Sequence, residues 1–84
     1  WPATQSQRMF ARGAAADSQN EKQTAIELYQ RAVELYPLND TAHYALGVLL
    51  DSQGRLPEAI SCFENAVRIA PGSVDYRMAL AAGY

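Results

Sequence analysis

One stretch of this chain repeats itself after 34 residues. Nine of the 25 positions from 13 to 37 carry the same residue as the position 34 further along, in the stretch from 47 to 71. The identical residues include glycine, alanine, aspartate and proline, and they recur in the same order and at the same spacing. A fixed period of this length is typical of repeat proteins, in which a unit too small to bury its own apolar face stacks against its neighbours. The sequence therefore predicts a stack of repeats, and the surface of such a stack usually binds other proteins.

The spacing inside each copy resembles the tetratricopeptide repeat, whose pattern is W-x2-L-G-x2-Y, followed by A-x3-F and then P. The second copy places the matching residues at His43, Leu46, Gly47, Leu50, Ala59, Phe63, Ala66 and Pro71. The first copy matches more loosely, through Met9, Arg12, Gly13, Ala16, Ala25, Tyr29, Ala32 and Pro37. A third copy begins after Pro71 and contains Arg77, Leu80, Ala81 and Tyr84 at the same spacing.

This resemblance implies an all-α fold, a right-handed superhelical stack of antiparallel helix pairs. It divides a single domain, residues 1–84, into repeat 1 at about 6–39, repeat 2 at about 40–73 and a partial repeat 3 at about 74–84. Because the chain begins at a tryptophan and ends inside a repeat, we expect it to be a fragment of a longer protein.

Apolar periodicity and the positions of proline and glycine predict five helices, at about residues 5–18, 22–36, 41–53, 57–70 and 74–84. Pro37 ends the second helix, and either Asn39 or Asp40 can cap the third. Asn20 and Gly54, which lie 34 residues apart, are expected to adopt the left-handed conformation in the turns after the first and third helices.

Two glycines fall inside predicted helices, Gly13 and Gly47. Glycine there costs about 1 kcal/mol relative to alanine. The same cost at the same position of two repeats indicates that the paired helices approach each other closely. We expect Ala25 and Ala59 to be the small partners across this contact, and we assign the glycines a structural role only.

Charge and composition exclude several classes of function. The net charge is −2 and the seven basic residues are scattered, whereas a nucleic-acid footprint needs clustered lysine and arginine. No apolar run approaches the roughly 18 to 20 residues that cross a bilayer. We therefore expect neither a nucleic-acid partner nor membrane insertion. The single cysteine, Cys62, excludes an internal disulfide and is interpreted as a packed hydrophobe.

No arrangement of residues predicts catalysis, a metal site or a cofactor. His43 is the only histidine and takes a helix-packing position, and Ser18 and Ser52 have no histidine at a motif spacing. The chain has no Cys/His cluster and no glycine-rich phosphate loop. We expect no enzymatic activity; the sequence names no compartment, and the cytoplasm is assumed by default. Arg12 stands where the family has leucine, and it is either exposed or paired with a carboxylate.

In tetratricopeptide arrays the first helix of each repeat lines a concave groove, and the resemblance implies the same here. The positions in phase with that groove are Phe10, Ala14, Asp17, Thr41, Tyr44, Val48, Asp51 and Met78. Large apolar residues beside small ones make shallow pockets that suit an amphipathic helix or an extended peptide. The aspartates at the border favour a ligand with lysine or arginine. The predicted function is to bind a protein or peptide partner that is apolar and carries basic residues.

The alternative is a structural or assembly segment, whose apolar faces pack against copies of itself or against neighbouring repeats. The last predicted helix carries Leu80, Ala81 and Tyr84 on a face for which the chain supplies no partner helix. An exposed apolar strip favours burial against another molecule. This alternative predicts a homodimer joined through the C-terminal helix.

Overall fold

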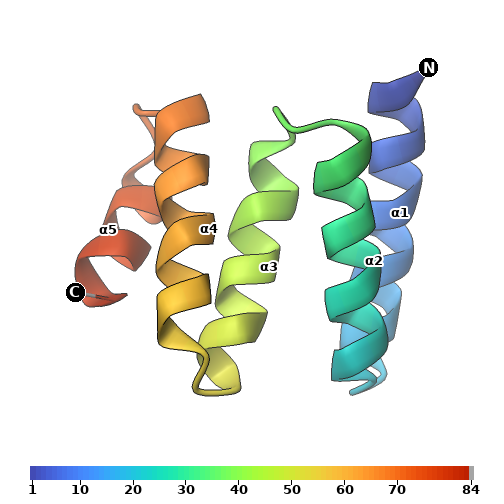
Figure 1. Cartoon of the computed structure of the whole chain (residues 1–84), viewed down its shortest axis with the longest axis horizontal. Coiled ribbons are helices and arrows are strands. Elements are labelled where there is room, and N and C mark those ends of the chain that lie inside the picture. Colours follow the sequence, from blue (N-terminus) through green and yellow to red (C-terminus); the bar gives the residue numbers. More distant parts are fainter. Residues whose placement is uncertain (84) are drawn as a thin grey trace.

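The computed structural model describes residues 1–83, which form five helices joined by short loops (Figure 1). The helices are α1 (Pro2–Ser18), α2 (Lys22–Leu35), α3 (Asp40–Ser52), α4 (Leu56–Ile69) and α5 (Val74–Gly83). No strand occurs among these residues. The five predicted helices are confirmed, with ends that differ from the expected ones by a few residues.

The helices form two antiparallel pairs and a fifth helix. α1 packs against α2 and α3 against α4, while α2 also contacts α3 and α4 contacts α5. In Figure 1, α2, α3 and α4 stand side by side, α1 lies behind α2, and α5 ends the row beside α4. The stack measures 31 × 27 × 17 Å.

The turns inside the two pairs are equivalent. Asn20 has φ 64° and Gly54 has φ 76°, the left-handed conformation that the sequence predicts for both. The following amides close the turns in the same way, because Glu21 N–H donates to the Ala16 carbonyl at 2.9 Å and Arg55 N–H donates to that of Leu50 at 3.0 Å. The fixed period is therefore visible in the hydrogen bonds of the backbone.

The glycines inside α1 and α3 lie under aromatic rings. A Cβ atom on Gly13 would approach the Tyr29 ring to 2.6 Å, and one on Gly47 would approach the Phe63 ring to the same distance. The close approach of the helices is confirmed. The atoms nearest to each glycine belong to an aromatic ring, whereas the sequence suggested Ala25 and Ala59 as the partners. Both alanines are buried.

A buried polar cluster joins α1, the end of α2 and the start of α3. The Ser6 hydroxyl donates to the Ala32 carbonyl at 2.6 Å, and Asn39 Nδ2 donates to Ser6 Oγ at 2.9 Å. The Asn39 side chain also caps α3, since its Oδ1 accepts from Ala42 N–H at 3.1 Å. Asn39 is thus the cap, and its second role as a link to α1 is a finding of the structure.

Four residues of α3 and its cap form the side on which the first helix pair lies, and we call them the junction row: Asn39, Ala42, Leu46 and Leu49. Ala42 and Leu49 project away from Gly47, the residue that contacts α4, yet they are only 0% and 2% exposed. α2 packs against α3 and Ser6 of α1 is hydrogen-bonded to Asn39, so we assign the cover of this side to the first helix pair. This row is the part of the second repeat that packs against the first.

Candidate partner-binding face

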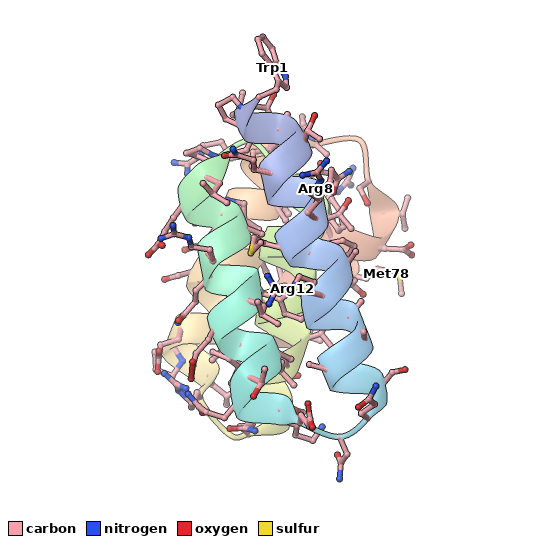
Figure 2. All side chains as sticks on the ribbon, turned by 90° about the vertical axis from the view of Figure 1, so that its right-hand side faces the viewer. Trp1, Arg8, Arg12 and Met78 are labelled. Carbon is pink, nitrogen blue, oxygen red and sulfur yellow. The ribbon has the colours of Figure 1, made fainter. Side chains whose placement is uncertain are left out.

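The residues predicted to line the groove lie on α1, α3 and α5, the first helices of the three repeats. Val48 and Met78 are 46% and 64% exposed, and Ala14 and Ala82 are exposed as well. Figure 2 shows Met78 projecting on the side of α1 that is turned away from α2. The described residues enclose no pocket, so these side chains form an open surface and not the shallow pockets that we expected.

Two aromatic side chains of this face are half-buried. The Phe10 ring lies 5.6 Å from that of Tyr29 on the paired helix. The Tyr44 ring lies 5.9 Å from Phe63 and 4.9 Å from Tyr76 on α5. Each ring therefore exposes only one part of its surface to solvent, and Tyr44 also contacts two neighbouring helices.

Tyr76 is a residue of this site that sequence reasoning missed. Its hydroxyl donates to Asp40 Oδ2 at 2.8 Å, which ties α5 to the start of α3. Burial raises the pKa of the Tyr76 phenol above 10.0, and the hydrogen bond to Asp40 raises it further. The sequence did contain a signal for Tyr76, because it lies 34 residues after Ala42. A large ring therefore stands where the preceding repeat has the methyl group of a fully buried alanine.

The border of the face is acidic and polar. Asp17, Asp51 and Thr41 are all exposed at the surface. Burial raises the pKa of the Tyr29 phenol, and the negative charge of Asp17 adds to that rise. The charge of Asp17 thus reaches the ring of Tyr29, against which Phe10 packs.

The groups with the greatest chemical reactivity lie in the core. His43 is buried, and its Nε2–H donates to the Pro37 carbonyl at 2.9 Å, which fixes the loop before α3. Burial raises the pKa of the Cys62 thiol from 9.0 to about 11, so the thiol stays neutral at physiological pH. Arg12 is exposed, with its guanidinium 3.9 Å from the Met9 sulfur. No group of three or more His, Cys, Asp or Glu in residues 1–83 is arranged to hold a metal.

The residues predicted for self-association separate in the structure. Leu80 is half-buried and packs against the core, whereas Ala81 is exposed. Tyr84 lies outside the described residues. The large apolar side chains that α5 exposes are Val74 and Met78. None of the described helices is long and apolar enough to span a membrane.

A stack of antiparallel helix pairs with a 34-residue period, glycine under an aromatic ring in each pair and an open face on the first helices defines a helical solenoid of the kind that scaffolds protein interactions. The family model of the tetratricopeptide repeat matches residues 10–74, and the chain belongs to that family.

Among solved structures the chain is similar to MamA. One crystal structure of MamA superimposes with a TM-score of 0.91 at 32% sequence identity, covering 98% of this chain and 48% of that one. A second gives the same TM-score and identity and covers 45% of its chain. A mutant of MamA gives a TM-score of 0.84 at 28% identity, covering 94% of this chain and 58% of that one. No curated protein sequence matches the chain.

This chain therefore spans about half the length of the MamA chains that it matches. The similarity establishes a shared arrangement of helices over almost all of residues 1–84.

Proposed function

We propose that this chain is a protein-interaction module without catalytic activity, and that it binds a peptide or helix on the face formed by α1, α3 and α5. The observation that carries the proposal is the pair Val48 and Met78, apolar side chains that remain 46% and 64% exposed on successive first helices. Single exposed apolar residues are ordinary, but Met78 repeats the position of Phe10 and Tyr44, and Val48 repeats that of Ala14 one turn further along, so the two continue one surface.

The chemistry of this face favours a partner that is apolar with basic residues. Val48 and Met78 supply area for an apolar side chain, and the half-buried rings of Phe10 and Tyr44 supply edges on which it can rest. Asp51, exposed one turn beyond Val48, would face a lysine or arginine. An amphipathic helix or an extended peptide with alternating apolar and basic residues meets these requirements.

Val48→Asp tests the face directly. The probe is a labelled helical peptide with leucines on one side and lysines flanking them, measured by fluorescence anisotropy against the full chain. We expect Val48→Asp to weaken binding about tenfold or more, because it places a buried charge at the centre of the contact. Leu56→Asp is the matched control, since Leu56 is similarly exposed at 44% but begins α4. Equal losses in the two variants would reject this face as the binding site.

Asp51→Lys tests the acidic border. Reversal of an exposed rim charge should lower the association rate for the basic peptide and weaken its salt dependence, with little change in the dissociation rate. Tyr44→Ala would not isolate the face, because Tyr44 also supports Phe63 and Tyr76 and its loss would loosen α5.

The second candidate function is assembly through α5. No residue of α5 is fully buried, and Val74 and Met78 expose apolar surface along it. A homodimer would cover that surface, and it would use Val74 and Ala81 more than the half-buried Leu80. Sedimentation equilibrium of Val74→Lys separates the two functions. If the function is assembly, Val74→Lys must be monomeric at concentrations where the unsubstituted chain associates. If the function is peptide binding at Val48, the two proteins should have the same molecular mass in solution.

A further inference from the structure

On α1 and α3 the proposed face presents the same order of side chains from the start of the helix to its end. Spacings of three and four residues place them on one side of each helix. A neutral polar residue comes first, then an aromatic ring, a small apolar residue and an aspartate: Gln7, Phe10, Ala14 and Asp17 on α1, and Thr41, Tyr44, Val48 and Asp51 on α3. Both helices begin at the same end of the stack (Figure 1). The face therefore has a neutral border where these helices begin and an acidic border where they end.

The acidic border lies where a carboxylate is unfavourable. Asp17 and Asp51 stand in the last turns of α1 and α3, which contain no basic residue and end in backbone carbonyls with a negative dipole. The turns that follow use only the backbone of these residues. Asn20 N–H donates to the Asp17 carbonyl at 2.9 Å, and Gly54 N–H donates to that of Asp51 at 3.0 Å. The carboxylates therefore serve no bond of the turns, yet they recur at the same position of both repeats.

No cation of the described chain neutralises this border. Within residues 1–83 neither Asp17 nor Asp51 takes part in an ion pair. Arg55, in the turn after α3, is paired with Glu58 at 2.6 Å. Lys22, at the start of α2, is half-buried. The negative charge of the two aspartates and of the helix ends beside them is therefore available to a cation from another molecule.

The opposite border also has two aspartates, but their charges are compensated. Asp40 and Asp75 stand in the first turns of α3 and α5, where the positive end of the helix dipole stabilises a carboxylate. Asp40 also accepts the hydrogen bond from the Tyr76 hydroxyl at 2.8 Å. In the rows of the face itself, α1 and α3 place the uncharged Gln7 and Thr41 at this border. A cation beside the apolar rows is therefore attracted more strongly to the ends of α1 and α3 than to their starts.

An amphipathic helix laid across these rows turns one flank of its apolar stripe to each border. When its lysines lie on one flank only, a single direction across the stack places them over Asp17 and Asp51. We infer that the face binds a helix with lysine or arginine on one flank of its apolar stripe, and that the acidic border fixes the direction in which this helix crosses α1, α3 and α5. The inference rests on the proposed function and adds the orientation of the partner to it.

The test uses two helical peptides of equal length and composition, with one stripe of leucines and two lysines on either its left or its right flank. Each peptide carries a nitroxide at its N-terminus, which broadens the amide signals of the nearest helix in the isotope-labelled full chain. We expect one peptide to broaden α1 and the other to broaden α5, each favouring its direction about fivefold or more, because two exposed charge pairs contribute. The preference should disappear in about 1 M salt, where screening acts over about 3 Å.

Asp17→Asn/Asp51→Asn tests the border that sets the direction. In this variant each peptide should broaden α1 and α5 to a similar extent and should bind about fivefold more weakly. Glu27→Gln/Glu34→Gln is the matched control, since it removes two exposed carboxylates of α2 and gives the same net charge. It should keep both the direction and the affinity of each peptide.

The outcomes separate this inference from the proposed function. If neither peptide binds, or if Val48→Asp leaves binding unchanged, the proposed face is rejected and the inference with it. If binding depends on Val48 but both peptides run in the same direction, or each runs equally in both, the inference alone is overturned. A direction that persists in Asp17→Asn/Asp51→Asn would also overturn it.

Discussion

The stack has two junctions, one where α3 meets α2 and one where α5 meets α4. They use equivalent positions of the repeat, but the residues at these positions are buried to different extents. At the inner junction Asn39, Ala42, Leu46 and Leu49 are all buried. At the outer junction the equivalent residues Ser73, Tyr76, Leu80 and Gly83 are all half-buried. The inner junction also contains the hydrogen bonds that join Ser6, Ala32 and Asn39, whereas the outer one is tied by the hydroxyl of Tyr76.

This difference shows that a fixed period does not give each junction the same strength. Ala42 lets the helices close on each other, but the ring of Tyr76 at the same position reaches to the edge of the contact, toward Tyr44 and Asp40. Because burial of apolar area and of satisfied polar groups stabilises a junction, the outer one should open first.

The largest expected effect comes from filling the contact beneath Phe63. Gly47→Leu should lower the free energy of unfolding by about 3 kcal/mol, since even a Cβ would lie 2.6 Å from that ring. The matched variant is Ala81→Leu, at the equivalent but exposed position of α5, and it should change stability by less than about 0.5 kcal/mol. Urea unfolding measures both, and Gly47→Ala serves if the leucine variant does not fold. Equal effects at 47 and 81 would contradict the difference between the inner and outer parts of the stack.

The buried polar cluster gives the next effect. Asn39→Ala removes the cap of α3 and leaves the Ser6 hydroxyl without its donor, so we expect a loss of about 2 kcal/mol in urea unfolding. Ser73→Ala removes the equivalent cap of α5, whose bond to Tyr76 N–H is longer at 3.4 Å, and should cost less than about 1 kcal/mol. A larger loss in Ser73→Ala would reverse our ranking of the junctions.

The third effect tests whether the pair α3–α4, against which α5 lies, is closed to water. The folded state favours the neutral thiol of Cys62, because burial raises its pKa from 9.0 to about 11. Its contribution to stability is therefore complete below pH 9 and is lost as the pH rises through about 11. The loss should reach about 2 kcal/mol relative to Cys62→Ala, whose profile contains the same tyrosine ionisations. Parallel stability profiles of the two proteins between about pH 8 and 11 would show that the thiol is hydrated.

The smallest effect concerns the tie between α5 and α3. Tyr76→Phe removes one hydrogen bond to Asp40 and should cost about 1 kcal/mol, equivalent to about fivefold faster exchange of the α5 amides. The amides of α3 should keep their exchange rates, because the inner junction does not depend on Tyr76. Uniform acceleration across α3 and α5 would indicate that the two junctions open together.

The sequence predicted the architecture well because the signals were local and repeated. Proline, glycine and asparagine at equivalent positions set the helix ends and the turns at Asn20 and Gly54. α1 begins at Pro2, earlier than expected, because proline suits the first turn of a helix. The closeness of the helices at Gly13 and Gly47 was also predictable from the cost of glycine in a helix.

The details of the contacts were harder to predict, since they depend on how side chains meet across helices. The rings over the glycines belong to Tyr29 and Phe63, whose direction is set by the crossing of the helices and not by spacing along one of them. The bond between Ser6 and Asn39 joins residues 33 positions apart, and a serine on a helix gives no sign that it is buried. Of the predicted partner-binding residues, the exposure of Val48, Asp51 and Met78 agrees with their expected position, while their use by a partner remains a prediction.

The graded closure of the two junctions has a mechanical consequence. If the protein is stretched between partners on α1 and α5, both junctions carry the same force, and the outer one, tied by Tyr76, should open before the one that contains the hydrogen bonds of Asn39. α5 would then peel away from α4 at low force and expose Leu80 and the face of Tyr44, while the two helix pairs stay joined. Under tension the five described helices would form an extensible link in which α5 is the weakest element, and the second pair would offer a new apolar surface only while force is applied.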